Sequence, residues 1–307
     1  CRAELADMPP RERDELLEQL GTAAIAYQVR SIIDLGDAYV GAPETSQGAT
    51  QALVIASLTL DPPRGVALWK KALGPEPRRG DLVRWSLILL GASTTVSPDA
   101  FNAIPADDDM LRRIADAGKA VAGDGDPVQA LCNLYDLHHG RCTALVLQLA
   151  PTLGTDAARR VLLYVINDFS KANLNVPTRS RVADVVDAVR RLMAVDADAA
   201  VERLLAAEDD SLLQEAILMG MCASGSEKAT EAAGSLRRVG AALPDSLALI
   251  LYARHADRLP GHDLRQLGII ASGGGQVDET LQAQAAWLYL KHSGRLDQAL
   301  ARIVSSS

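Results

Sequence analysis

Apolar residues recur at helical spacing along almost the whole chain, and this feature restricts the fold more than any other. In one representative segment, Val182, Val185, Val186, Val189 and Met193 occupy positions i, i+3, i+4, i+7 and i+11. On a helix of 3.6 residues per turn, these positions form a single apolar face. No run of alternating β-branched residues indicates a strand. The sequence therefore predicts an all-α protein.

Helix starts are marked by short capping signals. The pairs Asp61-Pro62, Ser97-Pro98 and Asp126-Pro127 each place a capping side chain directly before a proline. A proline in the first turn costs little, because its missing N–H would have no partner there. We expect a helix to begin at each pair.

Two acidic stretches, which start at Asp124 and Asp196, begin like calcium-binding loops. The twelfth position of such a loop normally holds a glutamate, but Tyr135 and Ala207 stand there instead. Acidic side chains are also favourable at helix N-termini. We therefore interpret both stretches as helix starts.

The breaks between the predicted helices are short, and they fall at residues 74–80, 123–127, 173–178, 243–245 and 259–263. Helices joined by such short turns lie antiparallel to their neighbours. Roughly fifteen helices are too many for one four-helix core, and stacked hairpins accommodate them better. The predicted architecture is an α-solenoid of stacked antiparallel helix hairpins.

Two internal features support a repeat architecture. The segments GMCASG at 220–225 and GIIASG at 268–273 share Gly-x-x-Ala-Ser-Gly and lie 48 residues apart, since 268 − 220 = 48. This spacing resembles the unit of HEAT-type repeats, which is about 40–47 residues long. The segment AAWLYLKHSGRLDQALARI at 285–303 resembles half of a tetratricopeptide (TPR) unit. The resemblance implies degenerate HEAT/TPR-like helical repeats.

The domain organisation expected from these patterns is simple. Residues 1–9 precede the first convincing helix and form an N-terminal tether, and residues 10–307 form one helical-repeat domain. The polar, proline-containing stretch at 173–180 divides the chain near its middle and is where we expect a bend.

The first residue of the chain is Cys1. This start resembles that of mature bacterial lipoproteins, in which the cysteine exposed by signal-peptide removal carries lipid on its sulfur. The resemblance implies lipidation at Cys1, and lipid chains anchor a soluble body to a membrane without a spanning helix. A fragment that happens to start at this residue, and ordinary secretion, are the alternatives.

Composition restricts the function further. The net charge is −8, which disfavours sequence-independent binding to DNA or RNA. Aromatic residues are 4% of the chain, whereas pockets for sugars and flat cofactors usually rely on aromatic faces. No nucleophile motif such as Gly-x-Ser-x-Gly occurs. We expect no catalytic residue and no cofactor.

One cluster of side chains contains residue types that bind metal ions and is a candidate metal site. Its members are Cys132, Asp136, His138, His139 and Cys142. On one continuous helix Cys132, Asp136 and His139 would share a face, and a turn after them would bring Cys142 alongside to complete a zinc site. Alternatively, the two cysteines form a disulfide, or they pack as ordinary core residues while the histidines close a helix. Ordinary packing is preferred, and the alternatives stay open.

Together these observations predict a non-catalytic lipoprotein that acts as a protein–protein interaction scaffold or as an accessory subunit of a membrane complex. Its expected location is the periplasmic or extracellular face of a bacterial membrane, through lipid on Cys1. Its expected partners are other proteins, with no nucleic acid. An untethered cytoplasmic helical-repeat adaptor is the alternative, followed by an α/α-barrel enzyme.

Overall fold

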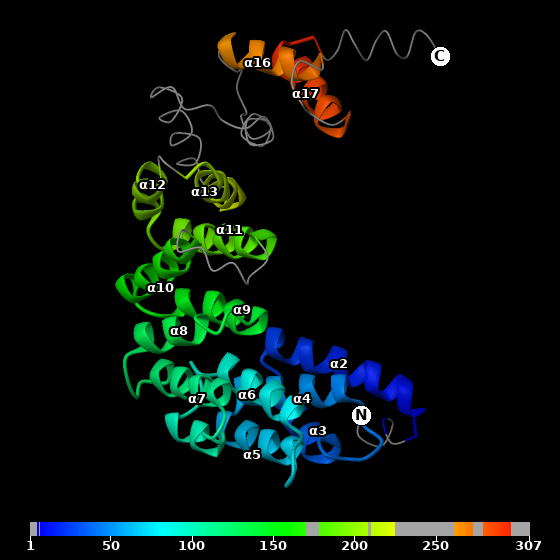
Figure 1. The fold of residues 1–307 in the computed structure, drawn as a ribbon. Coiled ribbons are helices and arrows are strands. Elements are labelled where there is room, and N and C mark those ends of the chain that lie inside the picture. Colours follow the sequence, from blue (N-terminus) through cyan, green and yellow to red (C-terminus); the bar gives the residue numbers. More distant parts are fainter. Residues whose placement is uncertain are drawn as a thin grey trace. The chain divides into compact units, whose positions relative to one another are not determined.

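The structure, a computed structural model, describes residues 5, 7–169, 178–207, 210–224, 261–272 and 279–295. Regular secondary structure in these ranges is entirely helical (Figure 1), which confirms the all-α prediction. Within the same ranges, no helix combines the length and the hydropathy that crossing a bilayer requires.

The chain divides into two compact units, residues 1–165 and 166–307. The division falls inside helix α10, ahead of the bend expected at 173–180. Only residues 178–180 of that stretch are described, and they begin helix α11. The first long helix starts at Pro10, at the end of the predicted tether, while Leu5 within the tether is buried.

The described helices of the first unit follow one another with short connections. They are α2 (Pro10–Tyr27), α3 (Ile32–Tyr39), α4 (Gln47–Leu60), α5 (Pro62–Leu73), α6 (Arg79–Gly91), η1 (Pro98–Ala103), α7 (Asp109–Val121), α8 (Pro127–Tyr135), α9 (Gly140–Leu149), η2 (Ala150–Thr152) and α10 (Thr155–Asp168).

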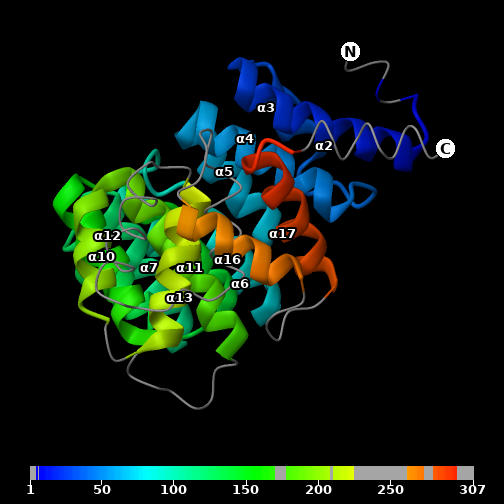
Figure 2. The ribbon, with the colours of Figure 1, turned by 90° about the horizontal axis from the view of Figure 1, so that it is seen from above.

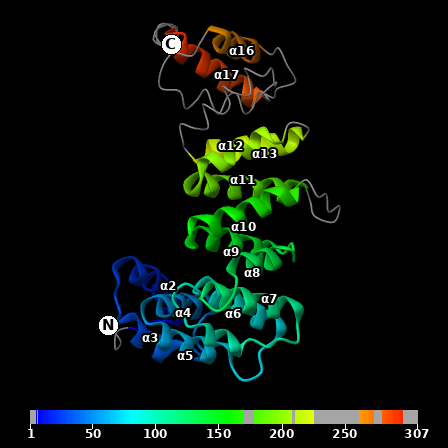
Figure 3. The same ribbon diagram turned by 90° about the vertical axis from the view of Figure 1, so that its left-hand side faces the viewer.

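Helices close in sequence pack on one another in this unit, most extensively α2 on α4 and α4 on α5, and α6 also contacts α9 (Figures 1 and 3). The core between α5 and α6 contains Trp69, which is fully buried. Its indole N–H donates a hydrogen bond to the carbonyl oxygen of Trp85 at 2.6 Å, so the polar group of this large side chain is satisfied.

The predicted helix starts are confirmed. Asp61 accepts a hydrogen bond from the backbone N–H of Arg64, and Asp126 accepts one from that of Val128. Ser97 caps the short 3₁₀ helix η1, and Asp196 caps α12 (Ala197–Leu205). These caps succeed as predictions because each bond spans only two or three residues.

A buried ion pair on α2 holds the loop before α4. Arg13 donates from Nη2 to the carbonyl oxygen of Glu44 at 3.1 Å, and the backbone N–H of Ser46 donates to Asp14 Oδ2 at 2.6 Å. Arg13 and Asp14 are 7% and 8% exposed. Ser46 is also the N-cap of α4, so α2 fixes the point where α4 begins.

The second unit contains α11 (Thr178–Val195), α12, α13 (Ser211–Ser224), α16 (Gly261–Ala271) and α17 (Glu279–His292). Helices α11 and α13 lie side by side (Figure 2). Helices α16 and α17 form a pair with its own small core, made of Leu267, Ile270, Ala285 and Leu288.

The two Gly-x-x-Ala-Ser-Gly segments both lie at the ends of helices that pack closely on a neighbour. A Cβ atom on Gly220 would lie 2.6 Å from the carbonyl oxygen of Val186, and one on Gly268 would lie 3.3 Å from Tyr289. The glycine at 225 and the glycine at 273 lie outside the described residues, as does the second helix of the TPR-like segment. The solenoid arrangement therefore stays a prediction.

Candidate functional site

An apolar groove runs between α4, α6 and α9 in the first unit. Its volume is about 660 Å³, within the range of about 300–1,000 Å³ that is typical of ligand-binding clefts. Its walls are formed by Gln47, Gln51, Ile55, Leu58, Thr59, Arg84, Leu87, Ile88, Gly91, Ala92, Arg141, Ala144, Leu145 and Gln148.

Helix α6 contributes one continuous face to this groove. Arg84, Leu87, Ile88 and Gly91 lie at i, i+3, i+4 and i+7, which places them on one side of the helix. Residues from the remainder of the helix, such as Leu89, are fully buried in the core of the unit. Helix α6 is therefore apolar on more than one side, and one of these sides faces the groove.

Helix α9 repeats the same pattern. Arg141, Ala144, Leu145 and Gln148 again lie at i, i+3, i+4 and i+7, with an arginine at the N-terminal end of the face. Helices α6 and α9 approach closely, since a Cβ atom on Gly91 would lie 3.7 Å from the Leu145 side chain. The glycine therefore allows the two helices to form adjacent walls.

Helix α4 supplies the third wall and runs parallel to α6. Gln47, at the start of α4, borders a smaller hollow together with Asp81, near the start of α6. At the other end, the Thr95 hydroxyl donates to the carbonyl oxygen of Leu58 at 3.2 Å, shortly after α6 ends. The Arg84 and Gln47 side chains therefore share one end of the groove, and Leu58 lies toward the other.

Both charged side chains that line the groove are arginines. Arg84 Nη1 lies 3.5 Å from Asp81 Oδ1, but that nitrogen is buried and forms no hydrogen bond with any described residue. Arg141 is exposed at the surface of α9. The groove thus combines an apolar wall with positive charge.

One large apolar side chain of the groove is exposed to solvent, whereas Leu58 and Leu87 are buried. Ile55 projects from the exposed side of α4 with 41% of its surface accessible. Exposing apolar area costs roughly 25 cal/mol per Å² relative to burial, so a partner that covers this side chain gains that free energy.

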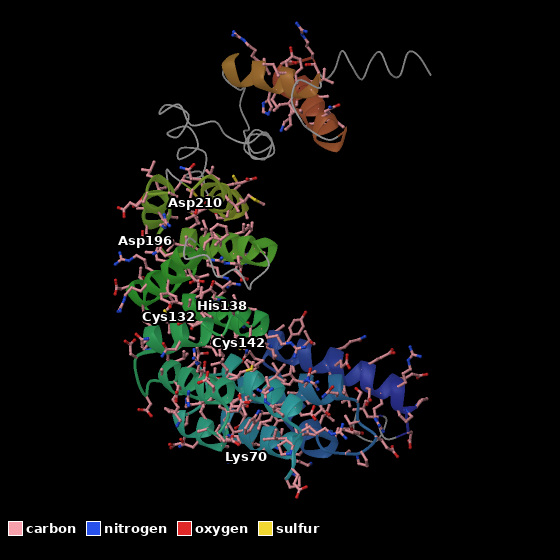
Figure 4. All side chains as sticks on the ribbon, viewed as in Figure 1. Lys70, Cys132, His138, Cys142, Asp196 and Asp210 are labelled. Carbon is pink, nitrogen blue, oxygen red and sulfur yellow. The ribbon has the colours of Figure 1, made fainter. Side chains whose placement is uncertain are left out.

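The structure places the predicted metal cluster at a turn instead of on one helix (Figure 4). Helix α8 ends at Tyr135, and Asp136 is its C-cap, while His139 is the N-cap of α9. The alternative in which Cys132, Asp136 and His139 share the face of one helix is therefore excluded.

The physical reason lies in the packing of this turn. His138 adopts a left-handed backbone conformation with φ of 47°, and its ring packs edge-on against Tyr135 at 5.6 Å. The hydroxyl of Tyr164 donates to Asp136 Oδ1 at 2.8 Å from helix α10. These contacts stabilise a turn at residues 136–139, so α8 does not continue through them.

The two cysteines of the cluster are buried and not joined by a disulfide. Burial raises the pKa of the Cys132 thiol to about 11, with the nearby charge of Asp136 adding to the effect, and burial alone raises that of Cys142 to about 11. Among the described residues, no group of three His, Cys, Asp or Glu side chains is placed to hold a metal ion. Cys1, the predicted lipidation site, lies outside the described residues.

The groove could not be identified from the sequence. An arginine with apolar residues at i+3 and i+4 begins its α6 and α9 faces, but the same pattern begins at Arg13 and Arg159, where Leu17 and Leu162 are fully buried. Comparison of the chain with protein-family models, with curated proteins and with solved structures finds no match.

Proposed function

We propose that the protein is a non-catalytic binding protein that holds a segment of a partner protein in the groove between α4, α6 and α9. The observation that supports this function best is the open apolar groove itself, with its half-exposed Ile55. The side chains along it supply apolar surface, amide hydrogen bonds and positive charge, which suit recognition. Grooves between helices commonly receive extended or helical segments of partners.

The proposal keeps the helical-repeat scaffold expected from the sequence. In a stack of helical hairpins, neighbouring helices expose a continuous row of faces, and such rows form extended binding surfaces. The faces of α4, α6 and α9 would form one such surface. Lipid at Cys1 and attachment to a membrane stay predictions, which mass spectrometry of the natural N-terminal peptide tests.

A peptide selection tests the binding function. The full chain is immobilised and a display library of random 16-residue peptides is selected on it. The enriched peptides are then measured by fluorescence anisotropy against wild type, Ile55→Glu and Ile269→Glu. Ile269 is the matched control because it is an exposed isoleucine on α16, with 52% of its surface accessible and no place in the groove.

The expected result is binding to wild type and to Ile269→Glu, with loss of binding to Ile55→Glu. Circular dichroism of the three proteins checks that the helices are retained. Peptides that bind all three proteins equally, or a selection without any enriched peptide, would refute the proposal.

A further inference from the structure

The charge of the groove is opposite to that of the molecule. The chain carries a net charge of −8, yet the charged side chains that line the groove are Arg84 and Arg141, both positive. Complementary potential steers partners and selects among them. The groove therefore favours a partner segment that is acidic.

Arg84 has hydrogen-bonding capacity that the structure leaves unused. Its guanidinium carries five N–H donors, and the Nη1 nitrogen is buried without a hydrogen bond to any described residue. Its ion pair with Asp81, at 3.5 Å, joins residues three positions apart on the same helix and contributes little. A planar guanidinium pairs well with a carboxylate, because two parallel N–H···O bonds can form.

The polar groups gather at one end of α4 and α6. Gln47 and Gln51 of α4 lie toward the end where α6 contributes Arg84, whereas Ile55 and Leu58 lie further along. The α4 wall extends over twelve residue steps, from Gln47 to Thr59, or about 18 Å at 1.5 Å per residue. That length matches about three turns of a bound helix.

We infer that the groove receives an acidic amphipathic helix of a partner protein. Apolar side chains of that helix, at i, i+3 or i+4 and i+7, pack against Ile55 and Ile88. A Glu or Asp side chain of the same helix pairs with Arg84, and the exposed Arg141 favours further negative charge on it. This inference rests on the proposed binding function and adds the chemical class of the partner.

A fatty acid also combines a carboxylate with an apolar body. Small-molecule sites, however, bury about 70–90% or more of their ligand in a concave cleft. The groove is instead an open surface formed by one side each of α4, α6 and α9. An open wall of this kind suits a helix that presents one face, so the peptide is the occupant proposed here.

The test compares matched peptides. The peptides selected on the full chain are synthesised with their acidic residues and again with each Glu or Asp changed to Gln or Asn. Binding is measured at ionic strengths of about 0.01 and 0.15 M, where the Debye length is about 30 and 8 Å. We expect the acidic forms to bind about tenfold more tightly at low salt, with a smaller ratio at high salt.

Protein variants assign the charge effect to the groove. Arg141→Glu should weaken the acidic peptides and spare the neutral ones, and Arg84→Gln should do the same. Arg30→Glu is the control for Arg141→Glu, because it makes the same change in net charge at an exposed position between α2 and α3. If Arg84→Gln does not fold, as judged by circular dichroism, the exposed Arg141 decides the test on its own.

The outcomes separate this inference from the proposed function. Peptides that depend on Ile55 but are neutral or basic would overturn the acidic partner and leave protein binding in place. A selection in which no peptide depends on Ile55 would overturn both. Oleate that binds wild type, loses affinity in Ile55→Glu and Arg84→Gln, and displaces the peptides would show a fatty-acid site and overturn both as well.

Discussion

Helices α4 and α5 meet at Gly65, where no side chain fits. A Cβ atom on Gly65 would lie 2.4 Å from the backbone nitrogen and 2.5 Å from the Cα atom of Leu58. Ordinary van der Waals contact begins near 3.4 Å, so an alanine would require a separation of about 1 Å more, since 3.4 − 2.4 = 1.0. Backbone atoms cannot rotate away as a flexible side chain can.

The expected cost of Gly65→Ala follows from two opposing terms. Alanine has a helix propensity about 1 kcal/mol more favourable than glycine. Overpacking costs typically about 1–3 kcal/mol, and a backbone clash belongs at the upper end or above it. In addition, α5 cannot move outward freely, because Leu68 and Trp69 on the same helix are buried. We expect a net loss of about 2 kcal/mol in the free energy of unfolding.

Urea unfolding followed by tryptophan fluorescence measures this loss. Trp69 and Trp85 are buried in the first unit and report its unfolding, whereas Trp287 is 53% exposed. With a slope of about 2 kcal/mol per M, the midpoint should fall by about 1 M. The matched control is Gly80→Ala on α6, where an added Cβ has no neighbour within 4 Å, so its midpoint should stay the same or rise. Equal midpoints for the two variants would refute the reasoning about the α4–α5 contact.

Three further predictions follow from single residues. Gln28 ends α2 in a left-handed conformation with φ of 56°, which glycine adopts more easily, so Gln28→Gly should raise the free energy of unfolding by about 0.5 kcal/mol. A lower urea midpoint would show that the lost side-chain hydrogen bond to Ile25 outweighs the relief of backbone strain. The thiols of Cys132 and Cys142 have pKa values of about 11, so only about one part in a thousand should be ionised at pH 8. Peptide mapping should show that iodoacetamide labels them only after unfolding, and rapid labelling of the folded protein would contradict this. Although burial opposes ionisation of Asp187, hydrogen bonds from two arginines on α11 hold its pKa below the ordinary value of 3.8, so its contribution to stability is present above that pH and is lost as the pH falls below it. Asp187→Asn should therefore be less stable than wild type at pH 7 and equal to it at pH 2. A difference in stability that persists at pH 2 would count against the ion pairs.

The helical class and the helix starts could be predicted from the sequence because both depend on nearby residues. The faces of α11 and the cap at Asp126 involve residues within a few turns of one another. The turn at residues 136–139 could not be predicted in this way. It depends on Tyr164, which is 28 residues further along the chain and hydrogen-bonds to Asp136.

The groove escaped prediction for a related reason. Ile55 and Ile88 have the spacing of ordinary core residues, and only the packing of three helices shows that they line an open surface. Periodicity identifies which side of a helix is apolar but does not say whether that side meets another helix or solvent. The arginine at the start of two such faces does not distinguish them either, because Arg159 begins the same pattern and its Leu162 is fully buried.

The hydrogen bond between Asp14 and the backbone of Ser46 also couples α2 to the groove. It joins the first long helix to Ser46, the N-cap of the helix that forms one groove wall, over a distance of 2.6 Å. Helix α2 also packs along α4. A displacement of α2 would therefore shift α4 and change the width of the groove.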